Sequence, residues 1–460
     1  MLNYLKLFIW SGIYYLQKCK SETIYKIIIK NIKESGCVLI KLTQWILPKV
    51  EVIYNIDKNN PKDSWFFELE DIYEDCEYHS IQHTKKVYRQ DFNRDIEDDY
   101  EIIGNIASGS IGQVYKLINK YDGTEHAMKV IHPNVGSKLY LIQAIVYLIY
   151  RIPILKDYFR YYFPFDMNDF ISDFKTQTDM ICEGNNLLYF NEIYKDQDVF
   201  VIPKVIKLSK NILIMSYEEG ECFDDIESSD YIKMKIILLN KIFVKNNEYT
   251  HRLMHGDLHK GNWKVRLCDD DKIKIVIYDY GFCWTMPDYL YGDDLLFIDR
   301  AFITPIKDRT AYIKACKMLI NNEKNSIEDM EKTVNIVEKD LRDGGMEGEY
   351  IFDDPIFLLN TILYSSRKGG FLINGFLFQS IIIHNQLCRN LEKYSLNIKN
   401  GKDDYYSNQI LNIITYCETL KICPEFLKVL RDEYDDLGIE KNQLFEDCQY
   451  LEKYNLQELI

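Results

Sequence analysis

Alternating apolar and polar side chains predict short strands in the middle of the chain. KIKIVIY at 272–278 alternates lysine with isoleucine, as a strand with one buried face does. HAMKV at 126–130 is a short apolar run around Lys129, and ILIMSYEEGE at 212–221 is apolar before it becomes acidic. We interpret both as strands of one small sheet, with a hinge after the second.

Longer apolar stretches predict helices around these strands. LYLIQAIVYLIY at 139–150 has the length of a core helix, with attachment to a membrane surface as the minor alternative. LNYLKLFIWSGIYYL at 2–16 is short of the roughly twenty residues that span a bilayer, which favours a buried or interfacial helix. DFKTQTDMICEGNNLLYF at 173–190 is typical of a helix, and its apolar face would consist of Phe174, Ile181, Leu187 and Leu188.

Two polar motifs on either side of the lysine-isoleucine strand carry the strongest functional signal. HGDLHKGN at 255–262 precedes the strand and IYDYG at 277–281 ends it. An Asp two residues after a His, an Asn five residues later and an Asp-x-Gly beyond a strand follow the kinase order of base, metal-binding amide and metal-binding carboxylate. The motifs predict that Asp257 acts on a phosphoryl acceptor and that Asn262 and Asp279 hold Mg²⁺.

Two other interpretations of these motifs compete. A lone Asp-x-Gly is more often a turn than a metal site, and only its order after the His-Gly-Asp motif favours the metal site. His255 and His259 stand four residues apart, a spacing at which two helical histidines could bind zinc. Zinc is the minor alternative, because Gly256 and Gly261 disfavour such a helix and the sequence offers no evident third ligand.

A second set of residues lies upstream, in the order that a nucleotide site requires. Lys129 would contact the nucleotide phosphates, and Glu183 from a helix would orient it. Lys129 alone is also compatible with a surface lysine at a strand edge, but the order of the whole set argues against that. ATP and Mg²⁺ are therefore the expected cofactors. The predicted phosphate-covering turn consists of Ile106, Ala107, Ser108, Gly109, Ser110, Ile111, Gly112, Gln113 and Val114.

Several segments together resemble the UbiB/ADCK atypical kinases, also called aarF-domain-containing kinases. The resemblance runs from about residue 30 to 285 and is specific because its motifs stand in the family order. It implies an ATP-dependent phosphotransferase whose N-terminal extension covers the ordinary peptide-substrate site. The segments that carry it are KLTQ at 41–44, SIGQVY at 110–115, AMKVIHPNV at 127–135, QTDMICEG at 177–184 and HGDLHKGN at 255–262.

The chain also departs from the family pattern. The departures are Thr43 for the glycine of KxGQ, Gln177 for the first glutamate of ExD, and Ser108 with Gly109 within the alanine-rich loop. Gly109 restores the close backbone approach of an ordinary glycine-rich loop. We expect Lys41 and Gln44 to fold over the cleft between two lobes and to limit which acceptors enter, with an exposed helical face as the alternative.

These landmarks predict an α+β protein with a two-lobed, protein-kinase-like fold. Residues 1–97 would form a helical extension that ends near DKNNPKDS at 57–64, and residues 98–218 would form a small lobe. The long connection between Lys129 and Glu183 predicts inserted helices packed on that lobe. Residues 219–460 would form a mainly helical large lobe.

Charge and cysteine content narrow the choice of partners and compartment. The net charge of -15 disfavours a nucleic-acid partner, which would need a positive phosphate-binding surface. Twelve cysteines without a CxxC pair, and no evident signal or transit peptide, favour an intracellular reducing compartment with free buried thiols. Contact with a membrane surface stays open as an alternative.

Three classes of function fit these observations. The first is a UbiB/ADCK-like kinase or ATPase that acts on an unidentified protein, a small lipid-like molecule or water. The second is a small-molecule kinase similar to aminoglycoside or choline phosphotransferases, which also use an HGDLHxGN loop; SIGQV and the pair Lys41 and Gln44 argue against it. The third is a nucleotide-binding scaffold without turnover.

Overall fold

The chain divides into two compact units in a computed structural model. The structure describes residues 22–53, 78–268, 272–286 and 363–380, with isolated positions outside these ranges. Unit 1 comprises residues 1–188 and 204–217, and unit 2 comprises residues 189–203 and 218–460. The segments at 2–16 and 57–64 lie outside the described residues, and the predicted domain limits stay a prediction.

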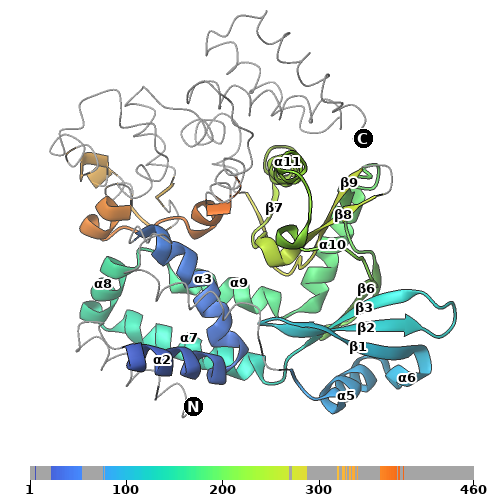
Figure 1. The fold of residues 1–460 in the computed structure, drawn as a ribbon. Helices are drawn as coiled ribbons and strands as arrows, with labels where there is room; N and C mark the ends of the chain where they lie inside the picture. Colours follow the sequence, from blue (N-terminus) through green and yellow to red (C-terminus); the bar gives the residue numbers. More distant parts are fainter. Residues whose placement is uncertain are drawn as a thin grey trace, which may run out of the picture. The chain divides into compact units, whose positions relative to one another are not determined.

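Unit 1 contains a five-stranded antiparallel sheet in the order β1-β2-β3-β6-β5 (Figure 1). Lys129 lies opposite Val114 of one neighbouring strand and opposite Leu213 of the other, so it projects from the middle of the sheet. The runs at 126–130 and 212–216 are thus strands of one sheet, as expected. The strands are β1 (Tyr100–Ser108), β2 (Gly112–Asn119), β3 (Glu125–Ile131), β5 (Val205–Leu208) and β6 (Ile212–Ser216).

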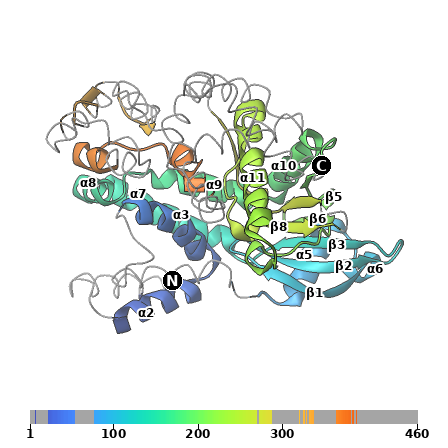
Figure 2. The same ribbon diagram turned by 45° about the horizontal axis from the view of Figure 1, so that its top comes forward.

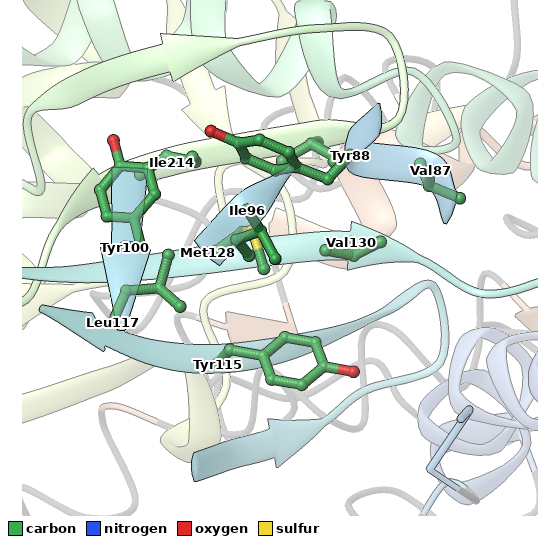
Figure 3. Packing of buried hydrophobic residues seen from close by; sticks show 10 residues of the cluster. Val87, Tyr88, Ile96, Tyr100, Tyr115, Leu117, Met128, Val130 and Ile214 are labelled. Carbon is green, nitrogen blue, oxygen red and sulfur yellow. The ribbon is translucent and has the colours of Figure 1, made fainter. Parts of the chain in front are cut away.

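Two helices cover one face of this sheet and close its core (Figure 3). Helix α5 (Ile81–Phe92) begins at Ser80, whose hydroxyl accepts a hydrogen bond from the His83 N–H, and α6 (Ile96–Asp99) follows it. The cluster consists of Val87, Tyr88, Ile96, Tyr100, Tyr115, Leu117, Met128, Val130, Ile212 and Ile214. A packed core on one face fixes the register of β3 and therefore the direction of Lys129.

Further helices belong to the described residues of unit 1. Helices α2 (Glu22–Ser35) and α3 (Cys37–Ile53) precede the sheet, and α7 (Val135–Arg151), α8 (Pro153–Tyr162) and α9 (Met167–Gln177) follow β3. Helix α3 lies beside α7 in both views (Figure 1, Figure 2). The centroid of the Trp45 ring lies 5.6 Å from that of Phe163 and 5.5 Å from that of Phe170. The inserted helices expected after Lys129 are present, but α8 has no buried residue.

The segment at 173–190 is two helices, which corrects the single helix expected there. Helix α9 ends at Gln177 and α10 (Met180–Ile193) begins three residues later. Asp179 causes the restart, because its carboxylate accepts a hydrogen bond from the Ile181 N–H at 3.0 Å. Of the predicted apolar face, Phe174 and Leu187 are buried; Ile181 and Leu188 are exposed.

Unit 2 is described mainly around its small sheets. Strand β9 (Ile273–Ile277) pairs with β8 (Trp263–Leu267) and with β4 (Phe200–Val201), while β7 (Leu253–His255) pairs with β10 (Cys283–Thr285). Helix α11 (Asp230–Asn246) precedes β7. Most of the predicted helical region after residue 286 lies outside the described residues.

Candidate active site

The predicted phosphate-covering turn joins β1 to β2. Its backbone closes where the Gly109 N–H donates to the Gly112 carbonyl at 3.0 Å. Gly109 is exposed, whereas Ser108, Ser110 and Ile111 are buried. The glycine is therefore accessible between buried neighbours, as a loop that approaches phosphate oxygens requires.

Gly112 is fixed by the neighbouring strand. A β-carbon at this position would lie 2.6 Å from the Val130 carbonyl oxygen, closer than real β-carbons approach. Any side chain here would therefore push β2 away from β3, next to Lys129. The glycine sets the spacing between the turn and the strand that carries the lysine.

Lys129 and Glu183 form a buried ion pair in unit 1. The Lys129 Nζ lies 2.9 Å from each Glu183 carboxylate oxygen, and the two side chains are 7% and 1% exposed. Asp179 caps the helix that brings Glu183 to the sheet. The contact that sequence order predicted is therefore present, although the two residues are 54 positions apart. Its role in nucleotide binding stays a prediction.

A histidine network that the sequence did not predict makes a hydrogen bond to the backbone of the turn. His132 Nε2 lies 2.9 Å from the Gly109 carbonyl oxygen, and His132 Nδ1 lies 2.9 Å from His79 Nδ1. His79 Nε2 then meets the Thr84 hydroxyl at 2.8 Å, and Thr84 meets the Tyr115 hydroxyl at 2.7 Å. The only sequence signal was the His-Pro pair that follows the lysine strand.

One arrangement of protons satisfies every member of this network. The Gly109 carbonyl only accepts, so His132 Nε2 carries a proton and neutral His132 accepts at Nδ1 from His79. His79 then accepts at Nε2 from Thr84. Burial, and next the nearby rings of His132 and His83, lower the pKa of His79 to about 4. Burial also lowers the pKa of His132. Protonation of His132 would place two N–H donors against each other, and protonation of His79 would place its Nε2–H against the Thr84 hydroxyl that donates to it.

This network predicts a specific loss of stability in acid. The folded-state pKa of His79 lies below its ordinary value of 6.5, so the unfolded chain takes up a proton first as the pH falls. The stability that the neutral network contributes is present above pH 6.5 and is lost as the pH falls toward 4. Urea unfolding of the full chain at neutral pH and near pH 5 should show this loss. The His79→Gln/His132→Gln variant should lose less between the two values; an equal loss would contradict the network.

His255 organises the corresponding loop in unit 2. The residue ends β7 and is buried, with Nε2 3.0 Å from the Tyr278 carbonyl oxygen. Its Nδ1 accepts from the Asp257 N–H at 3.3 Å. Both ring nitrogens are therefore used within the protein, and His255 lies on a strand end rather than on a zinc-binding helix with His259. Burial lowers the pKa of His255, which matches the neutral ring that this pattern needs.

Asn262 and Asp257 are linked through the loop backbone. The Asn262 Nδ2 donates to the Asp257 carbonyl at 2.7 Å, which turns the amide oxygen Oδ1 away from that contact. Asn262 is buried, while the side chain of Asp257 is 24% exposed. Asp257 therefore keeps an accessible carboxylate, as a residue that meets an acceptor needs.

Asp279 follows β9 in a special backbone conformation. Its φ of 54° lies in the left-handed region, and its Oδ1 accepts from the Gly281 N–H at 3.3 Å. The Tyr278 N–H donates to the Asn262 carbonyl at 2.8 Å, so the segments carrying Asn262 and Asp279 lie side by side. A non-glycine residue in this region is uncommon and occurs often at functional sites.

The donor atoms of unit 2 fit Mg²⁺. A carboxylate and an amide oxygen are hard ligands, and Mg²⁺ commonly takes only one or two protein ligands beside water and phosphate. Within the described residues no group of three or more His, Cys, Asp or Glu side chains is arranged to hold a metal. Asn262 and Asp279 would therefore be ligands for an ion that arrives with phosphate, and this role stays a prediction.

The described cysteines modify one expectation. Six of them are free thiols, in agreement with the absence of CxxC pairs. Only Cys37 and Cys76 are buried, however, and Cys222 is exposed. The prediction that the free thiols are buried is therefore wrong for most of the described cysteines.

Unit 1 contains a small antiparallel sheet with a buried Lys–Glu pair, and unit 2 contains the Asp, Asn and Asp-x-Gly loops. These features define a kinase-like protein. Comparison with known families makes the class specific. Residues 71–292 match the model of the ABC1 atypical kinase-like domain. This part of the chain is therefore similar to the ABC1 atypical kinase-like family, and the resemblance to UbiB/ADCK kinases is confirmed.

Named relatives agree with this assignment at low identity. The probable serine/threonine-protein kinase abkC of Dictyostelium discoideum is 27% identical over 56% of this chain and 37% of its own length. The ABC1 family protein MCP2 of Saccharomyces cerevisiae is 25% identical over 55% of this chain and 46% of its own length. This chain therefore spans less than half the length of these relatives. The solved structure of Rv3197 with erythromycin, from Mycobacterium tuberculosis, is 18% identical with a TM-score of 0.41, covering 64% of this chain and 80% of that one.

Proposed function

We propose that this protein is a Mg²⁺-dependent ATP phosphotransferase or ATPase. The observation that carries the proposal is the buried pair of Lys129 with Glu183, the pair that orients a nucleotide lysine in protein kinases. A buried ion pair gives little net stability, because desolvation offsets much of its attraction. Its presence in the middle of a sheet beside a glycine turn is better explained by phosphate binding than by stability.

Each unit contributes one part of the proposed chemistry. In unit 1, Lys129 binds the phosphates under the turn at 106–114. In unit 2, the side-chain oxygens of Asn262 and Asp279 would hold Mg²⁺. The bound ion would neutralise negative charge on the phosphates. The accessible carboxylate of Asp257 orients the acceptor and takes its proton. The hinge after β6 offers backbone groups to the adenine.

The charge of the chain and the names of its relatives narrow the class of acceptor. A protein hydroxyl, a small lipid-like molecule and water all fit an accessible Asp257, whereas the net charge of -15 disfavours a nucleic acid. The relatives named as protein kinases favour a hydroxyl on a protein. Free thiols fit a reducing compartment inside a cell.

A nucleotide-binding and turnover assay tests the proposal. The purified chain should show a higher melting temperature with ATP and Mg²⁺ than with ATP and a chelator, because ligand that binds only the folded state stabilises it. Release of ADP should require Mg²⁺ and should rise when the true acceptor is added. Stabilisation without any turnover would favour a scaffold, and no Mg²⁺-dependent stabilisation at all would refute the proposed nucleotide site.

A further inference from the structure

Two consecutive carbonyl groups of the hinge after β6 are held by side chains from elsewhere in unit 2. The Tyr278 hydroxyl donates to the Glu218 carbonyl at 2.7 Å. Arg266 donates to the Glu219 carbonyl from Nε at 3.0 Å and from Nη2 at 2.9 Å. Tyr278 is 60 positions from its partner and Arg266 is 47 positions from its own, so the fold and not the local chain sets the direction of both carbonyls. We call Tyr278 and Arg266 the hinge lock.

The hinge residues beyond these carbonyls are attached to β8. Glu221 and Val265 exchange backbone hydrogen bonds, at 2.7 Å from the Glu221 N–H and at 2.9 Å from the Val265 N–H. A β-carbon at Gly220 would lie 2.8 Å from the Lys264 β-carbon, closer than real β-carbons approach. A larger residue would push the hinge away from β8, so the glycine permits this close approach.

Tyr278 also connects the hinge to the loops that carry the predicted metal ligands. Its N–H donates to the Asn262 carbonyl at 2.8 Å, its carbonyl accepts from His255 Nε2 at 3.0 Å, and the next residue is Asp279. The backbone of Tyr278 is therefore fixed on both sides, and its hydroxyl reaches the hinge from a fixed position. Phenylalanine differs from tyrosine by this hydroxyl alone, so the contact can be removed without changing the ring.

The hinge lock opposes rotation of two peptide planes. Each peptide unit carries a carbonyl acceptor and an N–H donor on opposite sides, so rotation of the plane exchanges one for the other. Rotation is easiest beside a glycine, which accepts positive φ readily, and the Glu219 carbonyl belongs to the peptide that joins Glu219 to Gly220. Rotation here would break both hydrogen bonds of Arg266, and rotation of the preceding peptide would break that of Tyr278.

Adenine and guanine differ in the group that such a peptide would meet. Adenine carries an amino donor at its 6 position, whereas guanine carries a carbonyl acceptor there. Backbone groups in one orientation therefore suit one base, and a rotated peptide would suit the other. A hinge that is free to rotate accepts both bases, but a hinge with fixed donors and acceptors distinguishes them.

We propose that Tyr278 and Arg266 are positioning residues that hold the hinge in one hydrogen-bonding pattern and thereby select adenine over guanine nucleotides. This proposal rests on the proposed function, because it needs a nucleotide at the hinge. It goes beyond that function by naming the residues that set the base specificity. Every contact of the hinge lock lies within unit 2.

The relative affinity for ATP and GTP tests the hinge lock in the full chain. We expect the unchanged chain to prefer Mg²⁺ with ATP over Mg²⁺ with GTP, measured by titration of the melting temperature. Tyr278→Phe/Arg266→Gln should lower this preference about tenfold, because the lost hydrogen bonds favour one orientation of the hinge. Tyr278→Phe alone, which removes a single hydroxyl, should show a smaller change of the same kind. Arg266→Lys keeps the charge beside the Glu218 carboxylate but loses the fork of two donors, so it should also lower the preference.

Hydrogen exchange tests the hinge lock without any nucleotide. Amides of residues 218–221 should exchange faster in Tyr278→Phe/Arg266→Gln than in the unchanged chain, because loss of both contacts lets this segment open locally. Tyr189→Phe is the matched control. Tyr189 is a tyrosine of unit 2 that is 46% exposed, and its variant should show neither the altered preference nor the faster exchange.

Each contrary result has a distinct meaning. An unchanged ratio of ATP to GTP affinity in Tyr278→Phe/Arg266→Gln, even if both affinities fall, would overturn the role of the hinge lock in base selection. Unchanged hydrogen exchange at residues 218–221 would show that the two side chains do not hold the hinge. Failure of the proposed function has another signature: the unchanged chain would bind neither nucleotide, and the proposed base selectivity would be overturned together with it.

Discussion

Asp279→Asn should abolish Mg²⁺-dependent nucleotide binding, whereas Asp257→Asn should strongly reduce turnover and leave binding nearly unchanged. The difference arises because a carboxylate on Mg²⁺ is needed before the phosphates can be held, while a carboxylate facing the acceptor acts only during transfer. For Asp257→Asn we expect turnover to fall by roughly a hundredfold to ten-thousandfold. Asp279→Asn should show no turnover and no stabilisation by Mg²⁺ and ATP.

Asparagine is the right replacement because of the backbone at Asp279. Its φ of 54° is left-handed, a region that Asn enters more readily than most residues. The amide oxygen of Asn can also accept the hydrogen bond of the Gly281 N–H. Loss of binding in this variant would therefore reflect the lost charge and not a strained loop.

The measurements are a titration of melting temperature with Mg²⁺ and ATP, and the rate of ADP release. Asp225→Asn is the matched control, since Asp225 is an exposed aspartate of unit 2 that the site does not use, and it should behave like the unchanged chain. Equal loss of nucleotide binding in Asp257→Asn and Asp279→Asn would contradict the separate roles.

The sequence could predict the strands and the order of the site because those signals are local. Alternation at 272–278 predicted a strand that the structure has at Ile273–Ile277, and the lysine run became β3. The pairing of Lys129 with Glu183 was predictable from motif order, although the two residues are distant in sequence. Each of these inferences needed only a pattern within a few residues, or a known order of patterns.

The histidine networks could not be predicted because tertiary packing creates them. His79 and His132 are 53 positions apart in the sequence, and neither lies in a periodic pattern that would predict their contact. His255 was considered only as a zinc ligand, whereas its partner is the backbone carbonyl of Tyr278. The prediction of a single helix at 173–190 is also wrong. The carboxylate of Asp179 caps a new helix there, and this outweighs the continuous apolar pattern.

The cover that Lys41 and Gln44 were predicted to form stays a prediction. Both residues lie in α3 within unit 1, and both have interactions with neighbouring groups. Thr43, which replaces the family glycine, donates its hydroxyl to the Leu39 carbonyl at 2.9 Å. This bond satisfies the additional polar group inside the helix, so α3 tolerates the threonine without a break.

Lys129→Met should both destabilise the protein and abolish nucleotide binding, and a second substitution should separate these effects. The variant removes the cation that the buried Glu183 carboxylate faces at 2.9 Å, which should lower the free energy of unfolding by about 3 to 5 kcal/mol. Glu183→Gln in the same chain removes the buried charge. We expect Lys129→Met/Glu183→Gln to recover most of the lost stability, because a neutral pair avoids the cost of an isolated buried carboxylate.

Nucleotide binding should not recover in the double variant. Its stability is close to that of the unchanged chain, so a failure to bind Mg²⁺ and ATP can only reflect the missing contact between Lys129 and phosphate. Urea unfolding gives the free energies for the two single variants and the double variant, and a double-mutant cycle isolates the coupling of the pair. The same samples are then titrated with ATP and Mg²⁺. Normal binding by the double variant would show that Lys129 and Glu183 stabilise the sheet of unit 1 and do not bind the nucleotide.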